Sequence, residues 1–452
     1  MCACEIVERD EAGMVAKMYV AAGEGRRVDV IVPQRTKSYV QRVVDVFLPA
    51  GYPGSDSLQA FSSSIAGMLS SRAVLQARTL QSNGYRTNAR HIGVGVGDSS
   101  ASPTAALLLS VLQESMGRIA TILFAHRLGT ALEPECKMYR LAADVLNDTA
   151  MMLDCLSPAF PKPLRVLVLS FSSVLRSLCG VCAGSAKASL SAHFAKKGNL
   201  GELNAPGNGH FIAWDVVVSW VSTPIMTWSV LIALLSMHLA TNYAAVRAVS
   251  MRCLNRQRAN IVFSTILQHG LVLTPLEVSQ RERIFERDGV LRWVDDRILA
   301  SCRIGAALED LLSRLGQRHK RTGALELHTV KLSDLMDVFA SEAYLLWFAD
   351  SDCEAIVVLK QGCTPIDQLK AWTHALLLAQ KLTGHLSGHK PKGDDALRAD
   401  DRLAVLTSTL EDVSDIFVKY TTLLGQNGWD LDVAALETRA GMRIGIAALG
   451  PI

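Results

Sequence analysis

Three polar side chains share one face of an expected helix in the N-terminal half of the chain. Asp144, Asn147 and Asp148 stand at positions i, i+3 and i+4, which are neighbours on a helix surface. Carboxylates among apolar helices must be paired or must face water, because an unpaired buried charge is costly. These residues could therefore line a polar pocket or an ion-coupled path. Alternatively, they form a structural network that locks helices together, which is the interpretation we favour.

Charged residues nearby extend this set. Arg140 lies one turn before Asp144, and Glu114 and Arg118 form an i, i+4 pair on the preceding expected helix. The candidate polar network is therefore Glu114, Arg118, Arg140, Asp144, Asn147 and Asp148. In a carrier, the same residues would line the path of a small molecule.

A basic cluster follows a later helix. His193, Lys196 and Lys197 could contact lipid headgroups or an anionic ligand such as a phosphorylated vitamin, but a solvated helix end has the same composition. The sequence GVGVG at 93–97 lacks the GxGxxG spacing of a dinucleotide loop and fits a tight turn better. Cys179 and Cys182 have redox spacing but no second pair, so they fit small core residues better.

The sequence carries no motif that indicates a reaction. The chain has no HExxH, GxSxG or Walker motif and no paired set of metal ligands. We therefore expect no enzyme, no catalytic residue, no cofactor and no metal. The ten cysteines are scattered, which is typical of reduced thiols in an intracellular compartment.

The composition indicates contact with a membrane. Of the 452 residues, 49% are apolar and 20% charged, and the mean hydropathy is +0.22, which is unusually apolar for a soluble protein. The net charge of +3 does not favour nucleic acid. Residues 157–200 and 216–276 contain no acid but several Lys or Arg, and such basic flanks of apolar segments fit an anionic membrane surface.

Residues 216–241 are the strongest candidate for a membrane span. They are free of formal charge if His238 is neutral, and 26 residues of helix measure about 39 Å, against about 30 Å for a bilayer core. Pro224 counts against a straight helix, although membrane helices tolerate proline. A buried helix of a soluble core is the alternative. Basic residues on both sides leave the orientation open.

The sequence patterns of the remaining segments predict a mainly α-helical protein. An apolar helical bundle with expected membrane association precedes a smaller soluble α+β domain. We expect a mixed segment at 1–45 with a hairpin at 16–33, the helical domain at 46–260, a helical connector at 261–300 and the α+β domain at 301–452. Local signals predict the following elements: a helix at 104–125 that Gly129 caps, a helix from Pro134 to about Cys155, a hairpin at 343–360, a helix capped by Thr364 with Pro365 and Asp367 in its first turn, a helix at 411–425 and a last strand at 442–446.

The order of these segments resembles the root UV-B sensitive (RUS) family. The matching stretches are 47–53, 56–76, 93–106, 114–125, 137–161, 180–205 and 238–258, and the segment TPIDQLKAWTHALLLA fits the family's C-terminal domain. The chain departs from the family pattern at 54–55, 77–91 and 206–215, through divergence or gene-model faults.

The resemblance implies a membrane-associated protein without established enzymatic activity. Plant members of the family are linked to UV-B responses, seedling development, auxin transport and vitamin B6 homeostasis, and some pair with other members. We therefore expect a regulatory or interaction protein of an intracellular membrane, with membrane lipid and another family member as partners and no nucleic acid. A small-molecule carrier and a soluble ligand-binding protein are the alternatives.

Overall fold

The computed structural model of the chain describes residues 5–10, 13–22, 26–32, 103–194, 223–319, 322–349, 351–386, 399–438 and 441–447. The chain divides into two compact units. One, which we call the sheet unit, comprises Met1–Gln34, Leu128–Leu141 and Gly184–Ile452. The other, the helical unit, comprises Arg35–Arg127 and Ala142–Ala183. The chain is thus mainly helical, with its sheet mostly in the C-terminal part, as the sequence predicts.

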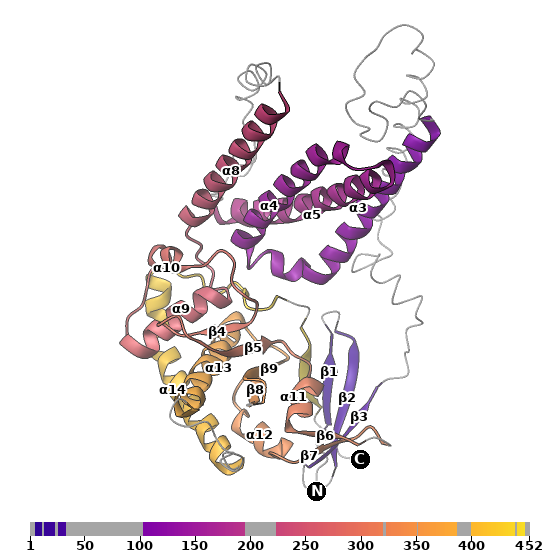
Figure 1. Ribbon diagram of the computed structural model, residues 1–452. Coiled ribbons are helices and arrows are strands. Elements are labelled where there is room, and N and C mark those ends of the chain that lie inside the picture. Colours follow the sequence, from indigo (N-terminus) through magenta and orange to yellow (C-terminus); the bar gives the residue numbers. More distant parts are fainter. Residues whose placement is uncertain are drawn as a thin grey trace. The chain divides into compact units, whose positions relative to one another are not determined.

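The sheet unit is organised around a mixed sheet (Figure 1). The strand order is β4-β5-β9-β10-β1-β2-β3-β7-β6, and β8 pairs with β9. β9 runs parallel to β5 and β10, and the other neighbours are antiparallel. The strand bounds are β1 Glu5–Arg9, β2 Val15–Ala22, β3 Arg27–Ile31, β4 Val290–Arg292, β5 Ile298–Ile304, β6 Gly316–Arg318, β7 Leu325–Leu327, β8 Tyr344–Ala349, β9 Glu354–Lys360 and β10 Arg443–Ala447.

The N-terminal strands are part of this sheet. β1 pairs with β10, and β3 pairs with β7. The buried Glu8 carboxylate accepts hydrogen bonds from the Tyr19 hydroxyl at 2.9 Å and from the Leu308 N–H at 2.7 Å. Leu308 begins α11 (Leu308–Leu315), whose N-cap residue Ala307 offers no side-chain acceptor. Glu8 therefore caps a helix 300 residues away, which fixes the N-terminal strands to the C-terminal half.

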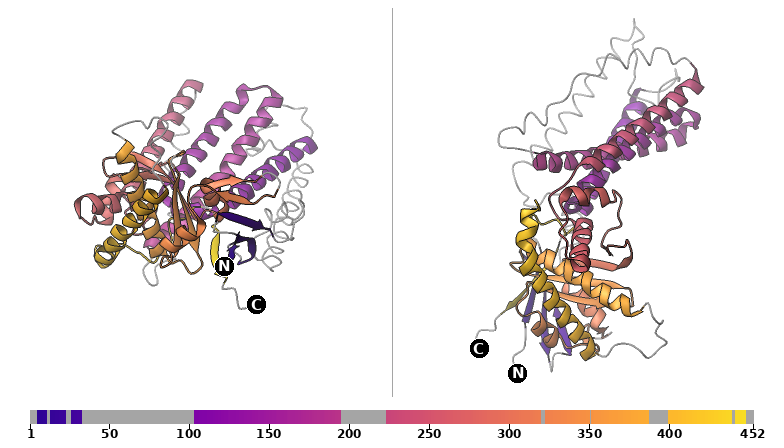
Figure 2. Two further views of the ribbon diagram at one scale, coloured as in Figure 1. Left: turned by 90° about the horizontal axis from the view of Figure 1, so that it is seen from below. Right: turned by 90° about the vertical axis from the view of Figure 1, so that its left-hand side faces the viewer.

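Helices cover the sheet (Figures 1 and 2). α13 (Pro365–Leu386) packs against β4, β5, β8 and β9, and α14 (Ala399–Gln426) packs against α13. Thr364 and Asp367 form reciprocal hydrogen bonds at the start of α13, as the sequence predicts. The other helices wholly in this unit are α8 Pro224–Ala248, α9 Arg256–His269, α10 Pro275–Arg281 and α12 Leu332–Val338.

Among the described residues, three helices contribute to the helical unit: α3 (Pro103–Leu132), α4 (Cys136–Leu156) and α5 (Lys162–Phe194). Small residues bring α5 close to the other two. Ser173 donates to the Gln113 carbonyl of α3 at 3.3 Å, and Ser172 donates to the Ala150 carbonyl of α4 at 3.1 Å. A Cβ added to Gly117 of α3 would lie 2.4 Å from the Ser177 hydroxyl, so a larger residue here would have to displace that hydroxyl.

Two local predictions are wrong. Gly129 does not cap α3, which continues to Leu132 because Ala131 and Leu132 are buried in the sheet unit. Residues 290–304, partly expected as a helical connector, form β4 and β5 because the buried faces of these strands pair with the rest of the sheet. The hairpins at 16–33 and 343–360, the helices from Pro365 and at 411–425, and the last strand are confirmed.

Candidate functional site

The first turn of α9 buries an unusual number of polar side chains. Asn255, Arg256, Gln257, Arg258 and Asn260 are all less than one-tenth exposed. Asn255 is the N-cap, and its side chain accepts a hydrogen bond from the Arg258 N–H at 2.9 Å. A helix start leaves backbone N–H groups without intrahelical partners, and the buried amide satisfies one of them. Buried polar side chains at a helix start need partners, so they identify this turn as the centre of a network.

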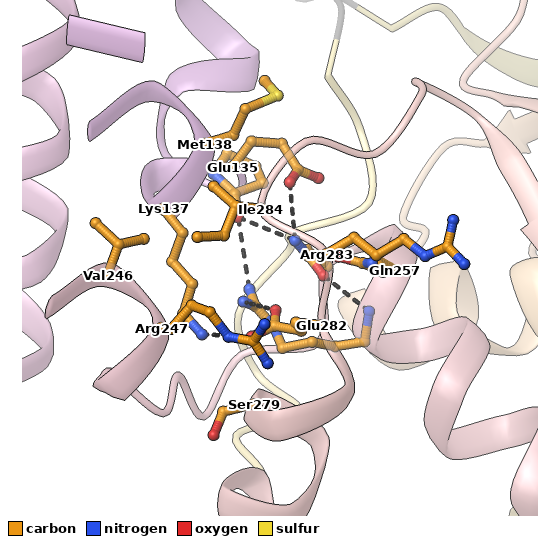
Figure 3. A pocket seen from close by; sticks show the side chains of 13 residues that line it. Glu135, Lys137, Met138, Val246, Arg247, Gln257, Ser279, Glu282, Arg283 and Ile284 are labelled. Atoms are coloured by element: carbon orange, nitrogen blue, oxygen red, sulfur yellow. Dashed lines mark hydrogen bonds and ion pairs between the residues drawn. The ribbon is translucent and has the colours of Figure 1, made fainter. Parts of the chain in front are cut away.

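One buried carboxylate joins two cations at this turn (Figure 3). The Arg258 guanidinium donates to one oxygen of Glu282 at 2.8 Å, and the Lys137 ammonium pairs with the other. The side chains of Arg258, Glu282 and Lys137 are 2%, 6% and 9% exposed. Burial is the largest single influence and would lower the pKa of Arg258, but Glu282 together with Cys253, Glu135 and Cys136 outweighs it, so the pKa is raised and the guanidinium stays charged.

A second carboxylate borders this ion triad. Glu135 accepts a hydrogen bond from the Asn255 amide at 3.0 Å. Burial raises the pKa of Glu135 above its ordinary value, against the opposing attraction of Arg258 and Arg256. The space between the triad and Glu135 is only about 10 Å³, which is at the lower limit for one water. The triad of Lys137, Glu282 and Arg258 is therefore a structural lock and not a ligand pocket.

Arg256 holds the other side of the same turn. Its Nε donates to the Leu436 carbonyl at 2.6 Å, its Nη1 pairs with Asp288, and its guanidinium lies 5.7 Å from the ring centre of Trp372. The Trp372 indole N–H in turn donates to the Asn260 side chain at 2.9 Å. Arg256 therefore fixes α9 to α13 and to the C-terminal loop.

A cavity of about 120 Å³ opens beside Arg256. Its walls combine apolar and polar side chains. They include Leu128, Met138, Tyr139, Glu135, Arg256 and Asp288. The cavity has room for several waters or a small organic group. A carboxyl group with a raised pKa on its wall can donate as well as accept a hydrogen bond. Within the described ranges, no group of three His, Cys, Asp or Glu side chains is placed to hold a metal ion.

The structure places the predicted polar network on two helices. Glu114 and Arg118 are exposed on α3, and among the described residues they form no ion pair with each other. On α4, Asp144 and Asp148 are buried and Asn147 is half-buried. The Asn147 amide lies 4.0 Å from the Met151 sulfur. Burial of two carboxylates on one face agrees with the spacing argument, and their role stays a prediction.

Arg140 is half-buried in the part of α4 that belongs to the sheet unit. His193 is half-buried at the end of α5. Lys196, Lys197 and the GVGVG turn lie outside the described residues. The basic cluster therefore also stays a prediction.

The lock was not predicted from the sequence, and two arginines of the same helix turn were misjudged. Arg256 and Arg258 were grouped with the basic, acid-free residues expected at a membrane surface, but they point inward to Asp288 and Glu282. The partners lie 32 and 24 residues further along the chain, beyond the acid-free stretch. Asn255 directly precedes the two arginines in the sequence. An asparagine N-cap at this position predicts that both arginines lie in the first turn of a helix.

Two helices of the described chain are long and apolar enough to cross a membrane: Pro163–His193 within α5 and Ile225–Ala248 within α8. In their most apolar stretches, 22% of α5 and 6% of α8 are buried. Arg176 of α5 pairs with Asp154 of α4, as expected for a charge in such a helix. α8 begins at Pro224 with Thr223 as N-cap and continues past Thr241, and residues 216–222 lie outside the described part.

Comparison with known proteins gives two family matches. Residues 33–270 match the vitamin B6 photo-protection and homoeostasis domain, and residues 272–439 match the C-terminal domain of root UVB sensitive proteins. RUS family member 1 of Dictyostelium discoideum is 33% identical over 56% of this chain, which spans about half (49%) of that relative.

Two relatives from Arabidopsis thaliana align over more of the chain. Protein root UVB sensitive 3 is 30% identical over 75% of each chain. Protein root UVB sensitive 2, chloroplastic, is 23% identical over 89% of this chain and 84% of its own length. No solved structure matches the chain.

Proposed function

This chain belongs to the root UVB sensitive family, and we propose that it acts at an intracellular membrane as a regulatory or interaction protein. Its N-terminal part carries the family's vitamin B6 photo-protection and homoeostasis domain, so vitamin B6 homoeostasis is the process in which we place it. The proposed role is non-catalytic, with membrane lipid and a second family member as partners. Roles in UV-B response, development or auxin transport would follow from such interactions.

The observation that carries the membrane proposal is α8. Its 25 residues are apolar on all sides and largely exposed, with Ile225, Ile232 and Met237 at 82%, 52% and 57%. A helix that is apolar all round is normally buried in a protein core or in a membrane. The helix is about 37 Å long at about 1.5 Å per residue, enough for a bilayer core of about 30 Å.

Alkaline carbonate extraction of membranes from cells that express the full chain tests the proposal. We expect the protein to stay in the pellet. Replacing Ile232 and Met237 by Asp should release it, because a central acidic residue in a span costs about 2.5–3.5 kcal/mol. Val418→Asp with Leu423→Asp is the matched control, since both residues are exposed apolar positions on α14. Release of the unchanged protein would contradict the proposal.

The burial of Asp144 and Asp148 on α4 supports a second candidate, a small-molecule carrier. Asp144→Asn and Asp148→Asn should then abolish uptake into vesicles while the thermal unfolding temperature stays unchanged. If both variants instead unfold at lower temperature, the carboxylates belong to a structural network and the carrier proposal fails.

A further inference from the structure

Exposed arginines gather where α8 ends on the sheet unit. Arg247, in the last turn of α8, donates to the Gln280 carbonyl of α10 at 2.9 Å. Arg281 follows Gln280 directly, and Arg283 borders the same hollow as Arg247 (Figure 3). We call Arg247, Arg281 and Arg283 the arginine surface. All three are exposed, and only Arg283 among them pairs with an acid in the described chain, Asp296 at 2.6 Å.

The sheet constrains how the chain can cross a membrane. The N-terminal strands pair with β10 and β7, so residues 5–31 and the C-terminal half lie on the same side of any bilayer. A chain that leaves and returns to one side crosses an even number of times. α8 therefore cannot be the sole span of this protein.

The two candidate membrane-spanning helices, α5 and α8, both contact the sheet unit through their C-terminal ends. Ala186 and Leu190, near the C-terminal end of α5, pack with Cys136 and Met251 of the sheet unit. Val246, near the C-terminal end of α8, is only 6% exposed. α4 begins on this unit as well, because Lys137 belongs to the lock. Both candidate helices therefore have their C-terminal ends on the sheet unit.

The charges on the two sides of α8 indicate which side this is. The twenty residues before Pro224 contain no Lys or Arg, whereas Arg247, Arg252, Arg256 and Arg258 lie at or just after the other end. Lys and Arg close to a span favour the cytoplasmic side, where the leaflet carries anionic lipid. Two of the four, Arg256 and Arg258, are buried in protein, whereas Arg247 and Arg252 are exposed. Arg281, the last residue of α10, and Arg283, just after it, add exposed positive charge beside Arg247.

We propose that the sheet unit lies against the anionic leaflet of the membrane, with the arginine surface on lipid phosphates and both chain termini on that side. This proposal rests on the membrane association proposed above. The recognised chemistry is the phosphate of an anionic glycerolipid headgroup at the end of an apolar helix.

Fusions to the full chain in Escherichia coli test the topology. Green fluorescent protein matures to fluorescence in the cytoplasm, and alkaline phosphatase is active only in the periplasm. We expect green fluorescent protein fused to either end to fluoresce in a carbonate-resistant membrane fraction, and alkaline phosphatase fused to either end to be inactive. One terminus on each side, or both in the periplasm, would overturn the proposal.

A charge experiment tests the surface. The full chain is extracted in mild detergent, and the ratio of phosphatidylglycerol to neutral lipid that remains with it is measured. Arg247→Gln, Arg281→Gln and Arg283→Gln together should reduce this ratio at least about fivefold, the effect of a single arginine at an anionic surface. Arg27→Gln, Arg297→Gln and Arg318→Gln change the net charge equally at other exposed positions and should leave the ratio unchanged.

Two outcomes separate the possible failures. If the triple variant retains the same lipid ratio while the unchanged protein resists carbonate, the arginine surface is wrong and the membrane proposal stands. If the unchanged protein washes off in carbonate, the membrane proposal itself fails. Inorganic phosphate that displaces the lipid better than chloride at equal ionic strength would indicate a discrete phosphate pocket and would also overturn the proposed surface.

Discussion

Two apolar helices of similar length in the sheet unit have opposite surroundings. α13, with 22 residues, lies between the sheet and α14, and Ala371, Trp372, Ala375, Leu376 and Ala379 are fully buried. α8, with 25 residues, keeps most of its apolar side chains exposed. Hydropathy alone gives both helices the same interpretation. The two helices differ in how much of their surface is covered by the rest of the protein.

The polar residues of the two helices differ in the same way. On α13, His374 is held between the Tyr344 hydroxyl at 3.0 Å and the Thr409 hydroxyl at 2.9 Å, and Trp372 donates to Asn260. Such pairing is required where water is excluded by protein. At the C-terminal end of α8, the Arg247 guanidinium donates to the Gln280 carbonyl at 2.9 Å. The exposed apolar side chains of α8 are what the proposed membrane association would cover.

The largest effect should come from the lock near the end of α8. Glu282→Gln removes the charge that Lys137 and Arg258 share and leaves two buried cations without their counterion. The free energy of unfolding should fall by about 3–5 kcal/mol. Denaturant unfolding of the detergent-purified full chain measures this. Asp296→Asn, at a pair exposed by 46% and 68%, should cost less than about 1 kcal/mol. Equal costs for the two variants would mean that the lock is not buried in solution.

Truncation of the two helices tests the comparison itself. Leu376→Ala on α13 opens a cavity in the sheet unit and should destabilise it by about 2–5 kcal/mol. Ile232→Ala on α8 should change the same unfolding transition by no more than about 0.5 kcal/mol, because that side chain is 52% exposed. A large cost at Ile232 would show that α8 is covered by protein.

The pH dependence of stability should come partly from α13. Burial lowers the pKa of His374 to about 3, against an ordinary value of 6.5. Between these values the unfolded chain binds a proton that the folded chain does not, so stability falls as the pH drops below about 6.5. The slope from this group approaches about 1.4 kcal/mol per pH unit. His374→Gln should flatten the curve of unfolding free energy against pH in this window, which denaturant unfolding at a series of pH values measures.

The smallest effect concerns the helix caps. Thr364→Ala removes the cap of α13 and should cost about 1 kcal/mol in the unfolding of the sheet unit. Thr223→Ala removes the corresponding cap of α8, where the Thr223 hydroxyl accepts from the Met226 N–H. Because α8 contributes little to the core of the sheet unit, Thr223→Ala should lower the thermal unfolding temperature less than Thr364→Ala. The reverse order would contradict the comparison.

Local structure could be predicted from the sequence where a short-range signal decides it. The Thr364-Pro365-Asp367 start of α13 and the β8–β9 hairpin depend on neighbouring residues, and both are confirmed. The end of α3 could not be predicted, because packing of Ala131 and Leu132 carries the helix past Gly129. The pairing of β1 with β10 also could not, since strand partners 440 residues apart leave no periodic signal.

The site was harder to predict than the fold. The spacing of Asp144 and Asp148 correctly indicated one helix face, and both are buried. The inward turn of Arg256 and Arg258 depends on partners at Asp288 and Glu282, which only the folded chain brings near. The charge pattern therefore assigned Arg247, Arg252, Arg256 and Arg258 to a membrane surface. Of these, Arg256 and Arg258 are buried in the protein.

Photolabelling tests the difference between the two helices most directly. A hydrophobic diazirine probe is dissolved in membranes that carry the full chain, activated by light, and located by mass spectrometry of the digested protein. Our account predicts label in the peptides that cover α8 and none in those that cover α13. Labelling of neither helix, or of both equally, would contradict the claim that lipid covers α8.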